Sequence, residues 1–444
     1  MEQKRETFAG GLSAVFALAG SAIGLGNIWR FPYIVGEYGG AAFIILYIIF
    51  SIMFALPIFF AESVIGRSTQ SSTFGAFDKL APGSKWRILC YFSVVTPMLI
   101  VCYYSVVGGW SVGYLGYSIA RSFGDMSIQE VSSLFSQFTG SVWAPIICHT
   151  IFILLCAIVV CGGVRGGIEK MSNLAMPTLF VTIILLMVFS LSAPGSGKGV
   201  AYLVKPDFSK ITGPAIAAAM GQSFFSLSLG VGTILTYSSY MKKEENIISS
   251  GSMTAVFDLV FALLASFVIM PAAFSAGIEP SSGPGLVFES LPFVFSQVGS
   301  ASPILSKIVT IAFFFTILVA ALTSEVSMFE VCTAFLMEEK KMTRKKGSII
   351  VLLVGWIGGI ICVLFPRVFD IMDFTASNIL MTLGALGFCL FVGWKMKKSI
   401  VFSELTNNGK NKFNQRIIKP LYIVIRYVAP IGVTLIFISN FINV

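Results

Sequence analysis

Charged side chains are scarce in this sequence: Asp, Glu, Lys and Arg make up 11% of the 444 residues, while hydrophobic residues make up 56%. A soluble globular chain carries about 25% charged residues, so this chain cannot cover a surface that faces water. The composition therefore excludes secreted disulfide scaffolds, disordered chains and ordinary cytosolic enzymes. It predicts an all-α polytopic protein that crosses a membrane several times.

Histidine, cysteine motifs and processing signals are also nearly missing. The single histidine, His149, is predicted to be a packing residue rather than a proton relay. The eight cysteines form no C-x-x-C pair, and we interpret them as small buried hydrophobic residues. No Asn-x-Ser/Thr sequon occurs, and the first residues, MEQKRETF, do not resemble a cleavable signal peptide. Because no hydrolytic or nucleotide-binding motif is present, we expect neither an enzyme nor a nucleic-acid partner.

Long apolar stretches are what the sequence has instead. A helix that crosses the hydrocarbon core needs about 20 residues, and eleven stretches meet this length. They lie near residues 11–35, 41–66, 87–121, 143–161, 168–192, 213–240, 247–277, 304–337, 347–366, 370–395 and 418–441. Residues 285–300 are instead predicted to be a loop with short helical pieces, because Pro292 and Gly299 interrupt them.

The basic residues predict the orientation of these spans. If the N-terminus is cytoplasmic, the inner segments hold 22 Lys and Arg residues and the outer segments hold six. Cytoplasmic loops accumulate positive charge, so this arrangement is favoured and also explains the net charge of +9. With eleven spans, the C-terminus is expected outside.

Two spans are interrupted by Gly-x-Gly at matching positions. The first contains Gly24-Leu25-Gly26 and the sixth contains Gly230-Val231-Gly232, with serine or asparagine nearby in both. One such motif is commonly a place of close helix packing, but two at symmetric positions indicate paired broken helices around a midplane binding site. The expected architecture is one transmembrane domain, 1–444. It consists of inverted five-helix repeats at about 11–192 and 213–395, plus an eleventh helix at about 418–441.

Longer motifs surround these interruptions. Residues 20–33 read GSAIGLGNIWRFPY and residues 221–230 read GQSFFSLSLG. They resemble the first-helix and sixth-helix signatures of the neurotransmitter:sodium symporters, and Leu322-Thr323-Ser324 and Met372-Asp373-Phe374 resemble two further pieces. The resemblance covers essentially the whole chain and is closest to the bacterial amino-acid branch. It implies a leucine-transporter-like fold and a multi-pass protein of a bacterial cytoplasmic (inner) membrane.

The resemblance also implies two sodium sites. Sodium is a hard cation that prefers oxygen ligands, and every matching position offers one. At the first site the matching positions, completed by the substrate carboxylate, are Ala22 (carbonyl), Asn27, Ser226 and Asp258. At the second site they are the carbonyls of Gly20, Ile23 and Ala320 and the hydroxyls of Thr323 and Ser324.

The implied substrate site lies between the broken segments and the third and eighth helices. The matching positions are Ser21, Ala22, Leu25, Gly26, Ile100, Tyr104, Phe225, Ser226, Ser228, Val231, Ser324 and Met328. Tyr104 would hydrogen-bond the substrate carboxylate. Gly24 stands where monoamine transporters carry an acidic residue, so an α-amino acid that brings its own carboxylate is favoured.

Gates on both sides of the site follow from the same resemblance. The outer gate would be Arg30 with Asp373 above the aromatic lid Phe225, and the inner gate would be Arg5 with Glu338, braced by Tyr240. The sequence departs from the family in ending after the eleventh helix, in Phe8, where a tryptophan is usual, and in Glu325, where a small hydroxyl residue is usual. Glu325 either borders the substrate side chain or instead faces another helix or water.

Together these features predict a sodium-coupled symporter, with two sodium ions, that imports large hydrophobic or aromatic amino acids by alternating access. Chloride should not be needed, because Asp258 supplies a fixed negative charge next to the first sodium site. Two alternatives remain at this stage: an amino-acid sensor with a transporter-like pocket, and a symporter for amino acids with polar tails. An ion channel is disfavoured because Phe225 and Leu25 flank the midplane.

Overall fold

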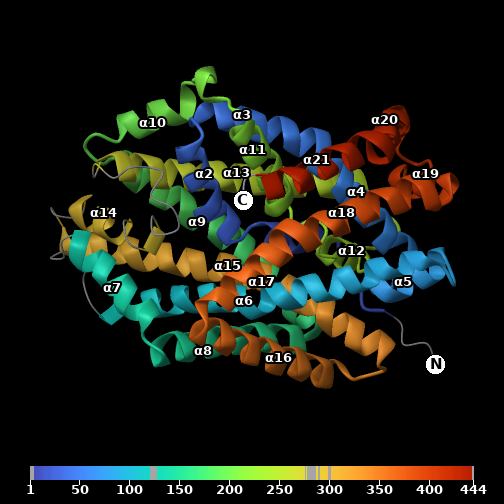
Figure 1. Cartoon of the computed structure of the whole chain (residues 1–444), viewed down its shortest axis with the longest axis horizontal. Coiled ribbons are helices and arrows are strands. Elements are labelled where there is room, and N and C mark those ends of the chain that lie inside the picture. The colour runs from blue at the N-terminus through green and yellow to red at the C-terminus, as the bar shows by residue number, and fades with distance from the viewer. Residues whose placement is uncertain are drawn as a thin grey trace.

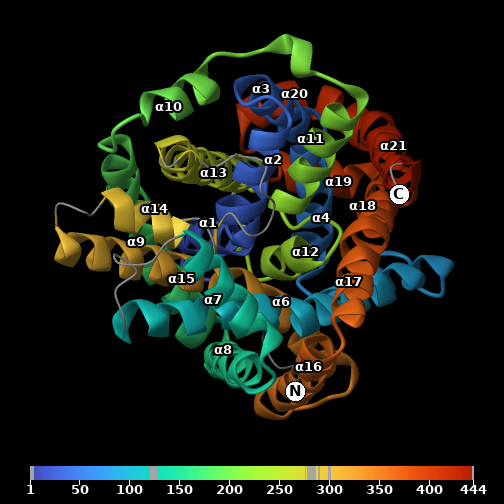
Figure 2. The same ribbon diagram turned by 60° about the vertical axis from the view of Figure 1, so that its left-hand side comes forward.

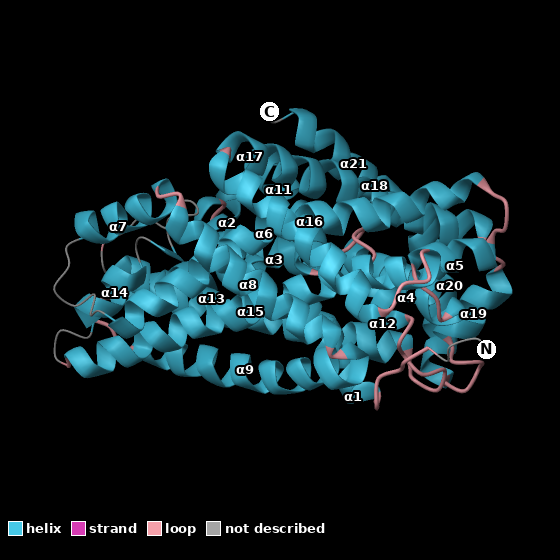
Figure 3. Ribbon diagram, turned by 90° about the horizontal axis from the view of Figure 1, so that it is seen from below, coloured by secondary structure: helices cyan, strands magenta, loops and turns pink. Residues whose placement is uncertain are grey.

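The computed structural model describes residues 5–120, 128–275, 277, 287–288, 291–298 and 302–442. These residues form helices and loops and contain no β-strand (Figure 3). The helices are α1 (Gly11–Ala22), α2 (Phe31–Glu37), α3 (Ala41–Phe50), α4 (Leu56–Thr69), α5 (Thr73–Leu80), α6 (Ile88–Ala120), α7 (Ile128–Gly140), α8 (Trp143–Cys161), α9 (Lys170–Leu191), α10 (Gly197–Val204), α11 (Gly213–Ser226), α12 (Thr233–Ser238), α13 (Ile247–Ser275), α14 (Leu291–Val298), α15 (Pro303–Glu339), α16 (Arg344–Leu364), α17 (Pro366–Phe374), α18 (Met381–Leu390), α19 (Lys398–Leu405), α20 (Lys412–Ile423) and α21 (Ala429–Ile442).

Short π-helical segments extend or join several of these helices. They cover Gly26–Arg30, Ser51–Ala55, Val164–Glu169, Thr375–Leu380, Phe391–Lys395 and Val424–Val428. Through them, α3 and α4 form one long helix, as do α17 with α18 and α20 with α21. In the described part of the chain, nine helices are long and apolar enough to cross a membrane.

The remaining two predicted spans are the broken ones. Gly11–Ala22 and Gly26–Glu37 pass the same test only as a pair, bent by 57°. The predicted span 213–240 consists of α11 and α12, which are separated by residues 227–232. Ser228, Gly230 and Gly232 have φ values of 51°, 79° and 85° in that segment. This left-handed backbone cannot continue an α-helix, and glycine adopts it without steric cost.

The broken helices lie in the middle of the bundle. Figure 2 places α1 and α12 among longer helices. The helix α1 contacts α13, α9 and α15, and α12 contacts α4 and α15. The long helices α6 and α15 pack along each other beside them. The interruptions are therefore enclosed by protein, as irregular backbone inside a bilayer requires. Within the predicted loop 285–300, the described residues include the short helix α14.

Candidate functional site

The two interruptions meet each other and α15 at Ser21. The carbonyl oxygen of Ser21 accepts hydrogen bonds from the hydroxyl of Ser228, at 3.1 Å, and from the hydroxyl of Ser324, at 3.2 Å. The Ser21 hydroxyl donates to Ser327 Oγ at 2.8 Å. The break in the first span is thus hydrogen-bonded to the break in the sixth span and to α15, which is the eighth span. These three elements, which the sequence analysis assigned to one site, therefore converge.

A cluster of oxygen atoms surrounds Asp258 on α13. Asn27 Nδ2 lies 2.7 Å from Asp258 Oδ1, and the Ser226 hydroxyl donates to Asp258 Oδ2 at 2.7 Å. Tyr47 also donates to Asp258 Oδ2, at 3.2 Å. Asp258 is 1% exposed and forms no ion pair with a basic residue in the described part of the chain. A buried negative charge of this kind requires compensation, and the amide, hydroxyl and carboxylate oxygens suit a hard cation.

A second group of oxygen atoms lies where α1 packs closely on α15. A Cβ built on Gly20 would lie 3.4 Å from Cβ of Thr323, so these two positions face each other. The Thr323 hydroxyl donates to the Ala320 carbonyl at 3.0 Å, and Ser324 donates to Ser21 as described above. A hydroxyl that donates its proton keeps lone pairs that can bind a cation. No group of three or more His, Cys, Asp or Glu side chains with metal-binding geometry occurs among the described residues.

An enclosed cavity of about 20 Å³ lies between the interruptions, α6 and α15, which is room for about one water molecule. Of the residues expected to contact substrate, the cavity is lined by Ala22, Gly26, Ile100, Tyr104, Phe225, Ser226, Ser228, Ser324 and Met328. Ser21, Leu25 and Val231 do not line it. Ser21 turns its hydroxyl toward Ser327, and Val231 is fully buried in the apolar core.

Three residues line the cavity without having been predicted as substrate contacts: Gly24, Tyr103 and Met381. Gly24 could be recognised in the sequence as a candidate, because it is part of the Gly-x-Gly motif. Tyr103 precedes Tyr104 on α6, and the rotation of that helix brings both tyrosines to the cavity wall. Met381 follows a π-helical segment, and its carbonyl oxygen would lie 1.9 Å from a Cβ on Gly230. Met381 therefore reaches the cavity because α18 packs closely on the interrupted segment around Gly230.

A side chain at Gly24 would meet tightly packed neighbours in the cavity wall. A Cβ there would lie 2.9 Å from Tyr104 Oη and 3.0 Å from Cβ of Ser324. The Leu25 N–H donates to Tyr104 Oη at 3.0 Å, so moving the phenol would break this buried hydrogen bond. We expect Gly24→Ala to weaken substrate binding about 5- to 30-fold, the equivalent of about 1–2 kcal/mol.

Equilibrium binding of the best substrate to purified protein measures this effect. Gly116→Ala is the matched control, because a Cβ on Gly116 of α6 meets nothing within 4 Å. Equal affinities of the Gly24 and Gly116 variants would contradict the tight packing inferred here.

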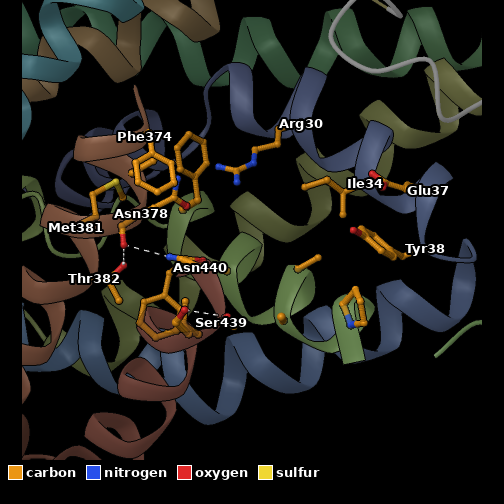
Figure 4. Close-up of a pocket in the computed structure, with 18 of the residues that line it drawn as sticks. Arg30, Ile34, Glu37, Tyr38, Phe374, Asn378, Met381, Thr382, Ser439 and Asn440 are labelled. Carbon is orange, nitrogen blue, oxygen red and sulfur yellow. Dashed lines mark hydrogen bonds between the residues drawn. The ribbon is translucent and has the colours of Figure 1, made fainter. Parts of the chain in front are cut away.

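A larger cavity of about 560 Å³ is lined by Arg30, Phe225 and Met381, among others (Figure 4). Phe225 and Met381 line both cavities and thus separate them. The guanidinium carbon of Arg30 lies 4.5 Å from the centre of the Phe225 ring. No ion pair joins Arg30 to Asp373, which instead accepts a hydrogen bond from Ser377 at 3.0 Å. Arg30 thus lies over the Phe225 ring, and the expected outer gate pair of Arg30 and Asp373 is not formed in this structure.

The last helix contributes to the wall of this larger cavity. Ile436, Ser439 and Asn440 of α21 line it, and Asn440 Nδ2 donates to the carbonyl oxygen of Asn378 at 3.1 Å (Figure 4).

The opposite end of the site is closed by charged and aromatic contacts. Arg5 forms an ion pair with Glu338, and its guanidinium carbon lies 4.7 Å from the centre of the Tyr240 ring. Tyr240 donates to Glu330 at 2.6 Å, and Glu330 is also paired with Arg344 at 2.6 Å. The structure therefore has a closed end at Arg5 and a wide cavity toward Arg30.

Glu325 and His149 lie outside the cavity. Glu325 is fully buried, does not line the cavity, and has no hydrogen-bond partner among the described residues. Of the two placements open from the sequence, the one against other helices is observed. His149 Nε2 lies 3.2 Å from the Trp356 carbonyl oxygen, and a Cβ on Gly359 would lie 2.3 Å from the imidazole. The imidazole fills a space between helices.

Comparison with known proteins accounts for this arrangement. Residues 5–130 and 120–444 match the sodium:neurotransmitter symporter family. The chain is 36% identical to the sodium-dependent transporter YhdH of Bacillus subtilis, over 99% of this chain and 98% of that protein, and 36% identical to a sodium-dependent transporter of Haemophilus influenzae with the same coverage. The crystal structure of MhsT in complex with L-phenylalanine superposes with a TM-score of 0.89 at 36% identity, covering 98% of this chain and all of MhsT. This multi-pass helical membrane protein therefore belongs to the sodium:neurotransmitter symporter family.

Proposed function

We propose that the chain is a sodium-coupled symporter that imports large hydrophobic or aromatic amino acids by alternating access. As a member of a transporter family it is not an enzyme. The observation that carries the proposal is the double role of Ser226, which lines the enclosed cavity and donates to the Asp258 carboxylate at 2.7 Å. A substrate carboxylate in the cavity would lie beside a cation held by Asn27 and Asp258. Each would then raise the affinity of the other.

The lining of the cavity supports the proposed substrate class. Ile100, Phe225, Met328 and Met381 supply apolar surface around the polar end formed by the interruptions. Methionine side chains are flexible and repack around different apolar shapes. A relative with 36% identity was crystallised with L-phenylalanine, which is the same substrate class. Because the cavity holds about one water molecule, we infer that Phe225 and Met381 move when substrate enters.

We also propose two sodium sites and a membrane orientation. Asn27, Ser226, Asp258 and the Ala22 carbonyl would hold one sodium ion, and the oxygen atoms of Gly20, Ile23, Ala320, Thr323 and Ser324 would hold a second. We propose a single domain of two inverted repeats, 11–192 and 213–395, in a bacterial inner membrane with a cytoplasmic N-terminus and an outside C-terminus. The contacts at Arg5 would then close the cytoplasmic side.

The test is uptake of labelled amino acids into proteoliposomes that contain the purified chain. We expect accumulation of phenylalanine, tryptophan, tyrosine or leucine only with an inward sodium gradient, and much weaker accumulation of alanine. Binding without accumulation would favour the sensor alternative. Preference for glutamine or another polar-tailed amino acid over phenylalanine would favour the polar-substrate alternative. Ion flux without coupled uptake would favour a channel.

A further inference from the structure

Arg426 packs against two aromatic rings that contact each other, where the last two long helices meet. Trp394, at the end of the helix that contains α18, donates through Nε1 to the Arg426 carbonyl oxygen at 3.0 Å. The guanidinium carbon of Arg426 lies 4.3 Å from the Trp394 ring centre and 5.3 Å from the Tyr427 ring centre. A Cβ on Gly393 would lie 2.9 Å from the Arg426 Cα, so the two backbones touch here. The side chain of Arg426 is therefore fixed against the ring of Trp394.

This guanidinium lacks an anionic partner in the described part of the chain. Arg426 forms no ion pair there, and its buried Nε has no hydrogen-bond acceptor. Glu404 is the only acidic residue between positions 395 and 423. It is already engaged by Arg67, at 2.6 Å, and by Lys243, at 3.1 Å. The Arg426 guanidinium is therefore left without a protein anion, so an anionic group from outside the chain can bind it.

The surroundings place Arg426 at a membrane surface. Trp394 is the residue before Lys395, where the long helix Pro366–Lys395 ends, so its contact brings Arg426 to the same level. Trp394 is 56% exposed and Tyr427 is 46% exposed, on the outside of the bundle. Amphipathic rings of this kind are enriched at the level of lipid headgroups. Figure 1 shows α18, α20 and α21 together on this side of the molecule.

The nearby chain adds further positive charge. Seven basic residues between α18 and the end of α20 are all exposed: Lys395, Lys397, Lys398, Lys410, Lys412, Arg416 and Lys419. Lys395 directly follows Trp394, and Lys419 precedes Arg426 by seven residues on one continuous helix. A planar guanidinium binds a phosphate through two parallel hydrogen bonds, and anionic lipids concentrate at basic juxtamembrane segments.

We propose that Arg426, packed against Trp394 and Tyr427, binds the phosphate of an anionic phospholipid at the membrane surface. Lys395 and Lys419 contribute a favourable potential, and the exposed faces of the two rings pack against the glycerol backbone and upper acyl chains. The site lies on the outer surface of the bundle, so it does not depend on the proposed substrate or ions.

Lipid retention tests this site. Purified chain is exchanged into detergent micelles with equal amounts of phosphatidylglycerol and phosphatidylcholine of the same acyl chains, and bound lipid is quantified by mass spectrometry. We expect the wild type to retain phosphatidylglycerol selectively. Arg426→Gln should lower this affinity about 10- to 100-fold, because hydrogen bonds to a charged group are lost. Arg416→Gln removes an exposed charge from the same basic segment and should lower it at most about fivefold.

Two further variants distinguish a specific lipid site at Arg426 from non-specific attraction of anionic lipid to the basic segment. Trp394→Leu leaves every charge in place and is expected to lower phosphatidylglycerol retention several-fold, as is Arg426→Lys, which keeps the charge without the planar fork. These two decide the outcome if Arg426→Gln does not fold. Equal effects of the Arg416 and Arg426 variants, or no effect of Trp394→Leu, would overturn the proposal. Displacement of the lipid by inorganic phosphate alone would show a free-anion site and overturn it as well.

Discussion

Sodium affinity is expected to fall about 5- to 150-fold in Asn27→Ala and, separately, in Thr323→Ala, because each change removes an oxygen ligand from a desolvated cation at a cost of about 1–3 kcal/mol. Asn27 lies 2.7 Å from the Asp258 carboxylate, at the first proposed site. Thr323 lies on α15 opposite Gly20, at the second. The measurement is the sodium concentration for half-maximal substrate binding and uptake by purified, reconstituted protein.

Thr310→Ala is the matched control for the second site. Thr310 is on the same helix, is also buried, and makes the same kind of backbone hydrogen bond, to Ser306, at 2.9 Å. Its replacement removes the same atoms without touching the proposed ligands, so sodium dependence should not change. If Asn27→Ala and Thr323→Ala bind sodium as the wild type does, both site assignments are wrong. If Thr310→Ala shares the defect, the effect belongs to the stability of α15.

The two variants should also differ in their coupling to substrate. The first proposed ion shares its surroundings with the cavity through Ser226, whereas the Thr323 hydroxyl donates within its own helix. Loss of Asn27 should therefore weaken the dependence of substrate affinity on sodium, since coupling is reciprocal. Loss of Thr323 should mainly raise the sodium requirement of transport.

The break in the sixth span could be predicted from sequence because its cause is local. Gly230 and Gly232 adopt left-handed backbone, which few other residues allow at low cost, and two such positions in one apolar span are visible without a structure. The oxygen-bearing residues around Asp258 could be predicted from the motifs that the chain shares with its family. The structure confirms the break in the first span and the all-helical fold.

Other parts of the site depend on how helices rotate and slide against each other. Met381 lines both cavities because its backbone packs on Gly230, a contact between residues that are far apart in sequence. Arg30 lies over Phe225 and not against Asp373, and both arrangements are compatible with the same motifs. Packing between helices determines side-chain geometry of this kind, and a sequence motif does not reveal that packing.

The second prediction is that uptake by the wild type needs no chloride. Tyr47 and Ser226 both donate to Asp258 Oδ2, at 3.2 Å and 2.7 Å. The carboxylate thus occupies the donors that a chloride ion would use. Two anions about 4 Å apart repel by about 4 kcal/mol at the effective dielectric constant of a protein site. Chloride affinity is therefore expected to be about a thousandfold lower than at a neutral site of the same shape.

Removing this carboxylate should create a chloride requirement. Gln222 lies one helical turn before Ser226 on α11, and its buried amide has no hydrogen-bond partner among the described residues. Asp258→Asn removes the charge, and Ala262→Ser adds a hydroxyl one helical turn away on α13. With Tyr47, Ser226 and the amide introduced at position 258, the double variant would then offer five groups that can donate to an anion. We expect its uptake in gluconate to fall at least about tenfold, the equivalent of about 1.4 kcal/mol, and to recover when chloride is restored.

The single variants assign the effect to the charge. Ala262→Ser keeps the Asp258 carboxylate, so its uptake should remain indifferent to chloride. Asp258→Asn lacks both the charge and the added hydroxyl, so chloride should restore its uptake less than it restores that of the double variant. The experiment compares initial uptake rates in chloride and in gluconate at constant sodium. A wild-type protein that loses uptake in gluconate, or an Ala262→Ser variant that gains chloride stimulation on its own, would show that the Asp258 charge does not replace chloride.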